Sequence, residues 1–142
     1  MMEKTILTAG DVAMDVLLNV PYAPNGGRTV ISKDRYAFTP GGSGAYTAVA
    51  ARRAGCRVAL CSRVGDDEQG QRLLRYFKDE DINIAHVSND GVNQTSLSVY
   101  LLEQFGLGGK VIYSGASARV SCADIESAFG CYPDLFTASL KT

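Results

Sequence analysis

Three glycines stand directly before an alanine-rich segment, in the run Pro40-Gly41-Gly42-Ser43-Gly44. The residues that follow, 45–54, favour a helix. Glycine adopts backbone conformations that other residues avoid, and it leaves room for a ligand to approach the backbone. The first turn of a helix adds unpaired N–H groups and a partial positive charge, which attract polar or anionic groups. The spacing predicts either a binding loop for such a ligand or a helix start whose glycines only allow tight packing.

Two phosphate-binding patterns do not fit this loop. A Walker loop requires G-x-x-x-x-G-K-[ST], whereas Gly109-Lys110 is followed by Val111 and lacks the upstream glycine. A dinucleotide fingerprint follows the first strand directly, but the run from Gly42 to Thr47 comes much later and has threonine in place of the third glycine. A nucleotide-binding oxidoreductase is therefore disfavoured.

Asp15 is the nearest acidic candidate for ligand binding. We expect it just past the first strand, and ligands of open α/β sheets bind at the carboxyl ends of the strands. Because a carboxylate accepts hydrogen bonds from hydroxyl groups, Asp15 suits a sugar or another polyol. The alternative is a capping or turn aspartate that binds no ligand.

The elements that must position these residues alternate along the chain. Apolar runs predict buried strands, and longer amphipathic runs predict helices: strands at 5–9, 57–61 and 135–140, helices at 45–54, 68–79 and 122–129. This alternation predicts an α/β fold with a parallel sheet covered on both faces. Short strand-like runs without partner helices predict an antiparallel flap beside that sheet: 16–20, 29–31, 36–38, 96–102 and 110–113.

The composition argues against several classes of partner. With 14 basic and 15 acidic residues, the chain has no overall attraction to nucleic acid or anionic membranes. No apolar run approaches the roughly 20 residues that cross a bilayer. The four cysteines are widely spread, and the amino terminus leads into a strand rather than a signal peptide. We therefore expect one cytoplasmic domain with reduced thiols.

Four segments, in order along the chain, resemble the ribokinase-like (PfkB) carbohydrate kinases. The segments are GDVAMD (10–15), PGGSGAYTAVAARRAG (40–55), VGDDEQG (64–70) and GASARVS (115–121). In the same order, they resemble the family's opening strand with its sugar-binding aspartate, its first signature, its VGDD-x-x-G turn and its GA-x-A-x-L-(S/T) segment. The resemblance spans essentially all of residues 1–142. It implies a ribokinase-like fold, with a mostly parallel sheet, flanking helices and a small antiparallel β lid whose strands lie at approximately 17–39 and 96–113.

The resemblance also implies a functional map. Asp15, Gly41, Gly42, Ser43 and Tyr46 would line the pocket for a sugar or nucleoside, and the lid would close over it and form a homodimer contact. Closure expels water that competes as phosphoryl acceptor. The implied reaction transfers the γ-phosphate of ATP to a hydroxyl, with Mg²⁺ neutralising phosphate charge.

Two residues and the length depart from the family pattern. Tyr46 stands where the family usually has asparagine, and its ring favours stacking on a sugar face or a base. Ala13 replaces an asparagine of ribose-specific members, so ribose itself is disfavoured. Family members are about twice as long, and their second half carries the ATP site and a GAGD-like motif with the catalytic base.

Nothing in residues 1–142 resembles that second half. We therefore expect a truncated, amino-terminal part of an ATP-dependent carbohydrate or nucleoside kinase. No catalytic, cofactor-binding or metal-binding residue is expected within it. The alternative is a non-catalytic fragment or remnant that binds a polyol or a protein partner.

Overall fold

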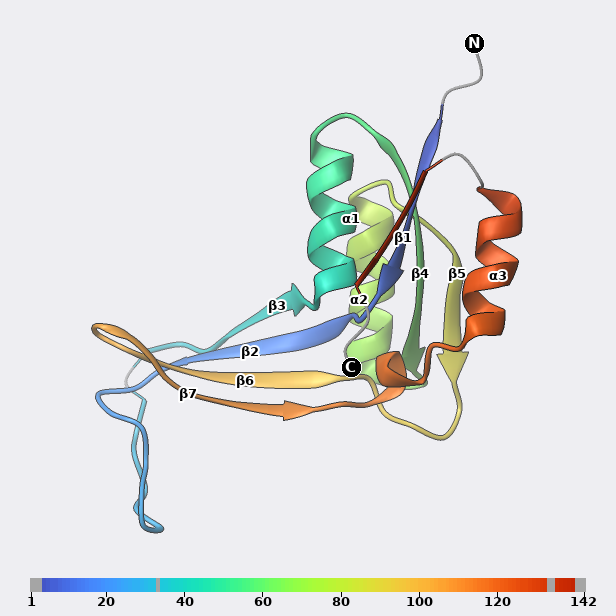
Figure 1. Ribbon diagram of the computed structural model, residues 1–142. Helices are drawn as coiled ribbons and strands as arrows, with labels where there is room; N and C mark the ends of the chain where they lie inside the picture. The colour runs from blue at the N-terminus through green and yellow to red at the C-terminus, as the bar shows by residue number, and fades with distance from the viewer. Residues whose placement is uncertain (1–3, 33, 133–134, 140–142) are drawn as a thin grey trace.

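The computed structural model describes residues 4–32, 34–132 and 135–139, which form two four-stranded sheets (Figure 1). The first sheet has the order β5-β4-β1-β8, and all of its pairs are parallel. Its strands are β1 (Thr5–Gly10), β4 (Arg57–Gly65), β5 (Asn83–Asp90) and β8 (Leu135–Ser139). We call it the parallel sheet.

Three helices cover the parallel sheet on its two faces. On one face, α1 (Ser43–Arg53) and α2 (Glu68–Asp79) enclose a cluster that includes Leu60 and Phe77. On the other face, α3 (Cys122–Cys131) covers a smaller cluster around Leu7 and Cys61. Coverage of both faces is what the apolar strands predict, because a strand buried on both sides has no polar face.

Local sequence explains where the helices begin. The side chain of Asp67 accepts a hydrogen bond from the backbone of Gly70 and caps α2. Ser121 and Asp124 form a reciprocal capping box at the start of α3. Helix α1 begins after Gly42, which has a φ of 96° and no side chain of its own to cap the helix.

The second sheet, which we call the lid sheet, has the order β3-β2-β6-β7. Its strands are β2 (Ala13–Asn19), β3 (Ala37–Gly41), β6 (Leu97–Glu103) and β7 (Gly106–Tyr113). Figure 1 shows it extending sideways from the parallel sheet, away from the three helices. The short 3₁₀ helix η1 (Ala116–Arg119) follows β7 and leads back towards α3.

The predicted α/β class with a parallel sheet and a second sheet is confirmed, but the lid sheet is not small, since it has four strands like the parallel sheet. It is mixed rather than purely antiparallel, because β2 and β6 run parallel. The run 29–31 forms no strand within the described part of the 20–36 connection. Strand β7 begins at Gly106, directly after the turn at residues 104–105, earlier than the predicted run 110–113.

Candidate functional site

Asp15 comes after the end of β1, where the sequence places it, and it lies within the next strand, β2 of the lid sheet. It stands between Ser98 of β6 and Thr39 of β3 in the sheet register. The residue is 2% exposed, and its Oδ1 atom finds no hydrogen-bond donor among the described residues. A buried acceptor left without a partner costs about 1–3 kcal/mol.

Gly41 makes room for the Asp15 carboxyl group. A Cβ atom built on Gly41 would lie 2.2 Å from both the Cγ and the Oδ2 of Asp15. No side chain can therefore occupy this position while Asp15 keeps its place. The first glycine of the loop acts through packing against an acidic side chain rather than through an unusual backbone angle.

Tyr46 reaches Asp15 from the first turns of α1. Its Oη donates a hydrogen bond of 3.0 Å to Oδ2 of Asp15, although the side chain is 56% exposed overall. Partial burial of the phenol and the nearby negative charge of Asp15 raise the pKa of Tyr46 to about 12. Tyr46 therefore remains a hydrogen-bond donor at neutral pH.

The helix start that could have held an anion is filled by Asp11. The Asp11 carboxylate accepts hydrogen bonds from the N–H of Ser43, at 3.1 Å, and from its hydroxyl. The Asp11 carbonyl accepts the N–H of Gly44 at 3.0 Å, and a Cβ on Gly42 would lie 2.4 Å from the same carbonyl oxygen. The loop therefore binds the end of β1, which makes it a poor cradle for a phosphate.

A cavity of about 260 Å³ opens beside this junction. Its polar lining comes from the end of β1, from β6 and from the segment after β7: Asp11, Ser96, Ser98, Ser114 and Ser117. The position agrees with the rule that open α/β sheets bind ligands at the carboxyl ends of their strands. Hydroxyls and a carboxylate around a small hollow suit a ligand rich in hydroxyl groups.

The sequence prediction assigned no role to Asp11 or to these serines. Asp11 and Ser117 both lie within segments that resemble the family motifs, which is the signal that could have marked them. Ser96 and Ser98 carry no such signal. They reach the cavity only because β6 pairs with β2, which places Ser98 opposite Asp15.

The VGDD-x-x-G segment serves as a joint between the two sheets. Asp67 accepts hydrogen bonds of 2.7 Å from both the backbone N–H and the hydroxyl of Thr95, just before β6. The Thr95 hydroxyl in turn accepts the N–H of Gly65 at 2.9 Å. Burial opposes the charge of Asp67, but these hydrogen bonds outweigh it and lower its pKa.

The GASARVS segment forms a second joint. The hydroxyl of Ser96 lies 2.7 Å from that of Ser117 and accepts the N–H of Gly115 at 3.0 Å. A Cβ on Gly115 would lie 2.1 Å from the carbonyl oxygen of Gln94. The two ends of the β6–β7 hairpin are thus joined to each other near the cavity, and the Thr95 end is attached to β4 through Gly65.

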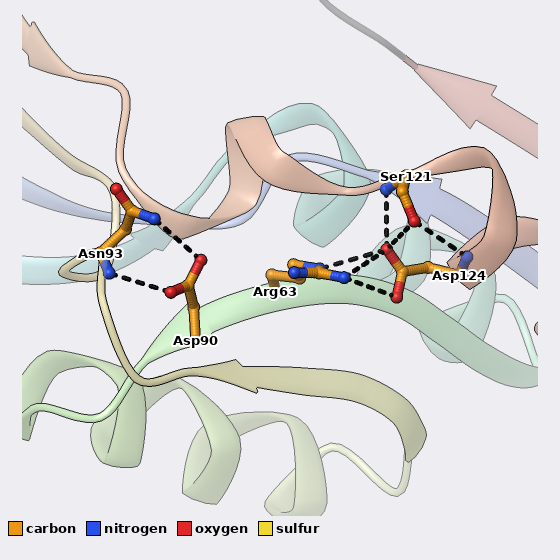
Figure 2. A network of polar contacts seen from close by, with 5 residues as sticks. All are labelled: Arg63, Asp90, Asn93, Ser121 and Asp124. Atoms are coloured by element: carbon orange, nitrogen blue, oxygen red, sulfur yellow. Dashed lines mark hydrogen bonds and ion pairs between the residues drawn. The ribbon is translucent and has the colours of Figure 1, made fainter.

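A polar network between β4 and α3, on the face of the parallel sheet that α3 covers, has a structural role (Figure 2). Arg63 of β4 forms an ion pair of 2.9 Å with Asp124 of α3, and Ser121 donates to the same carboxylate. Burial opposes ionisation of Asp124, but the hydrogen bonds from Arg63 and Ser121 hold its pKa at about 2. In the same view, Asp90 binds Asn93 in the turn after β5.

No group of three or more His, Cys, Asp or Glu side chains among the described residues is arranged to hold a metal ion. None of the helices in the described ranges is long and apolar enough to cross a membrane.

The parallel sheet with helices on both faces, the lid sheet beside it and the polar cavity at their junction define a two-sheet α/β protein. The sequence profile of the pfkB family carbohydrate kinases matches residues 3–129. The chain belongs to this family.

Three known proteins illustrate the relationship. The ribokinase of Haemophilus influenzae is 31% identical over 120 residues, which cover 84% of this chain and 39% of that protein. The ribokinase of Cryptococcus neoformans, solved in complex with ADP, has a TM-score of 0.71 and 25% identity, covering 80% of this chain and 36% of that one. A nucleoside kinase of Methanocaldococcus jannaschii has a TM-score of 0.71 and 26% identity, covering 80% and 38%. The chain spans about two fifths of the length of these relatives.

Proposed function

We propose that this chain is the acceptor-binding part of an ATP-dependent kinase that phosphorylates a hydroxyl of a sugar or nucleoside. The observation that carries the proposal is the buried Asp15 carboxylate, whose Oδ1 lacks a donor within the described ranges. It lies beside Ser98, which lines the polar cavity. A ligand hydroxyl supplies the missing donor.

The other predicted site residues act on Asp15 and Asp11. Gly41 leaves the space that the Asp15 carboxylate fills, and Gly42 allows the close approach of Asp11. Ser43 binds the Asp11 carboxylate, so its contribution to the acceptor site is to orient Asp11 at the cavity. Tyr46 orients Asp15 in the same way.

In this proposal the residues of the acceptor site hold neither ATP nor Mg²⁺. Asp11 fills the start of α1, which therefore does not fit a phosphate group. The ADP in the Cryptococcus neoformans ribokinase supports nucleotide use by relatives of this chain. When bound, Mg²⁺ would neutralise charge on the transferred phosphate, and the lid sheet would exclude water from the acceptor.

The lid sheet also offers a surface for a homodimer in this proposal. Phe38 and Val111 are exposed on its strands, at 40% and 67%. The non-catalytic alternative, a fragment that binds a polyol or a protein partner, makes the same use of these surfaces but transfers no phosphate.

The test is acceptor binding and phosphorylation by the full-length protein, screened with sugars and nucleosides in the presence of ATP and Mg²⁺. Asp15→Ala should abolish acceptor binding in calorimetry and leave the circular dichroism spectrum unchanged. Asp79→Ala, an exposed aspartate of α2, is the matched control. Unchanged affinity of Asp15→Ala would refute the assignment, and binding without phosphate transfer would favour the alternative.

A second variant pair tests the packing of the loop. Gly41→Ala should lose acceptor binding because its Cβ would overlap the Asp15 carboxyl group. Gly91→Ala, whose Cβ meets nothing within 4 Å, should bind normally. Equal binding by both variants would mean that Asp15 need not occupy its observed place for function.

A further inference from the structure

The two oxygens of the Asp15 carboxyl group have different surroundings. Oδ2 accepts the hydrogen bond from Tyr46 Oη at 3.0 Å. Oδ1 is buried and has no donor in the part of the chain that the structure describes. The two oxygens therefore differ, because Oδ2 is held by Tyr46 whereas Oδ1 lies buried against Gly41 without a protein donor in the described ranges.

Tyr46 holds its oxygen from a different layer of the molecule. Asp15 lies on the lid sheet, whereas Tyr46 lies on α1, whose residues Ala45 and Ala48 are buried against the parallel sheet. The Tyr46 ring also lines a second hollow of about 280 Å³ together with Thr39, the register neighbour of Asp15 on the side opposite Ser98. The two register neighbours of Asp15 thus line different hollows, Ser98 the polar cavity and Thr39 the second hollow, which Tyr46 also lines.

A free carboxylate can hold two adjacent hydroxyl groups, one on each oxygen. When a phenol already donates to Oδ2, the second hydroxyl of such a diol must compete with Tyr46 for that atom. Displacing the phenol replaces one hydrogen bond with another and leaves the buried part of Tyr46 without its partner. A ligand that presents one hydroxyl to Oδ1 makes the same gain without this loss.

We propose that Tyr46 is a specificity-determining residue that restricts Asp15 to one acceptor hydroxyl. The preferred acceptor class is a polyol without a neighbouring hydroxyl at the position that meets Asp15, such as a deoxy sugar. This inference rests on the proposed function, since it assumes that Asp15 receives the acceptor.

The experiment measures binding to the full-length protein by calorimetry with matched pairs of compounds. The pairs are D-ribose with 2-deoxy-D-ribose, and D-glucose with 2-deoxy- and 3-deoxy-D-glucose. In the unmodified protein, a deoxy member should bind at least as tightly as its parent diol. Tyr46→Phe keeps the ring but frees Oδ2, so it should improve binding of the parent diol relative to the deoxy sugar about fivefold, the equivalent of one hydrogen bond.

Two controls separate the possible failures. Tyr22→Phe changes an exposed tyrosine outside the site and should leave the ratio unchanged. If Asp15→Ala abolishes binding but Tyr46→Phe leaves the diol-to-deoxy ratio unchanged, the specificity role is overturned and the proposed function stands. If no compound binds, or if binding survives Asp15→Ala, the proposed function and this inference fail together.

A spectroscopic measurement checks the contact itself. The ultraviolet titration of the phenol, taken as the difference between the unmodified protein and Tyr46→Phe, should have its midpoint near pH 12 in the free protein. A bound deoxy sugar should leave that midpoint in place. A midpoint near pH 10, the ordinary value for tyrosine, would show that Tyr46 does not hold Asp15 and would overturn the inference.

Discussion

The two sheets of this protein are held together in different ways. The parallel sheet is covered on both faces, and its strands β1 and β4 contribute fully buried side chains such as Leu7 and Leu60. The lid sheet carries exposed apolar side chains, including Val111 and Leu107. Met14 of β2 packs into the core cluster beneath α1 and α2, and hydrogen bonds from Thr95 to Asp67 and from Tyr46 to Asp15 attach the lid sheet to the helices. Stability therefore resides in the first sheet, whereas the second depends on its joints.

The difference between the sheets also explains the position of the site. Asp15 and Ser98 belong to the lid sheet, and Asp11 and Tyr46 belong to the end of β1 and to α1. The polar cavity thus has walls from both sheets, so movement of the lid sheet at its joints would change its size. Elements with few buried contacts are the ones that can move in this way.

The largest expected effect is the loss of unfolding free energy when a buried side chain of the parallel sheet is shortened, compared with an exposed one of the lid sheet. Leu60→Ala should reduce the free energy of unfolding by about 2–5 kcal/mol, because Leu60 is fully buried beneath the helices. Val111→Ala, on the exposed face of the lid sheet, should change it by about 0.5 kcal/mol or less. Urea unfolding monitored by circular dichroism measures both, and similar losses for the two variants would contradict the comparison.

The ion pair between Arg63 and Asp124 should have the next largest effect on stability. Arg63→Met should cost about 2 kcal/mol at neutral pH, since it leaves the half-buried Asp124 without its cation. Because the folded pKa of about 2 lies below the ordinary value near 3.9, this contribution is present above about pH 4. It is lost as the pH falls towards 2.

Urea unfolding at several pH values measures this dependence. The unmodified protein and Arg63→Met should converge in stability between about pH 4 and pH 2. Arg52→Met removes a pair with Asp81, whose side chain is 84% exposed, and should cost far less. A difference for Arg63→Met that is constant across this pH range would argue against the ion pair as its cause.

The joint at Thr95 should have a smaller effect on stability but a specific effect on the lid sheet. Thr95→Val removes the hydroxyl that links Asp67 to Gly65 and should cost about 1 kcal/mol. Amide hydrogen exchange should become faster in β6 and β7, while β1 and β4 stay protected. Thr95→Ser keeps the hydroxyl and is the control, and uniform acceleration in both sheets would show that this joint is not local.

The smallest effect concerns a contact between α2 and β3. The guanidinium of Arg72 lies 5.3 Å from the centre of the Phe38 ring. Phe38→Leu should cost about 0.5 kcal/mol, the usual value of such a contact at an exposed site. A double-mutant cycle with Arg72→Ala isolates the coupling, and Phe105→Leu, at a 93% exposed position, is the control. A coupling of zero would show that the contact between Arg72 and Phe38 does not help to attach the lid sheet.

The order of the helices and strands, and most of the parallel sheet, can be predicted from the sequence alone. Apolar strands alternate with amphipathic helices, so the parallel sheet and its two covered faces follow from local patterns. The helix starts at Asp67 and Ser121 are also local, because each cap is made within three residues. The glycine loop could be recognised in the sequence for the same reason, because its residues are consecutive.

The contacts of the glycine loop and the surroundings of Asp15 depend on the tertiary structure. The hydrogen bonds from Ser43 to Asp11 and from Tyr46 to Asp15 join residues 32 and 31 positions apart. The serines of β6 enter the cavity through a parallel pairing of β2 with β6 that no local pattern predicted. Local sequence fixes propensity over a few residues, whereas these contacts depend on which distant strands pair and in which register.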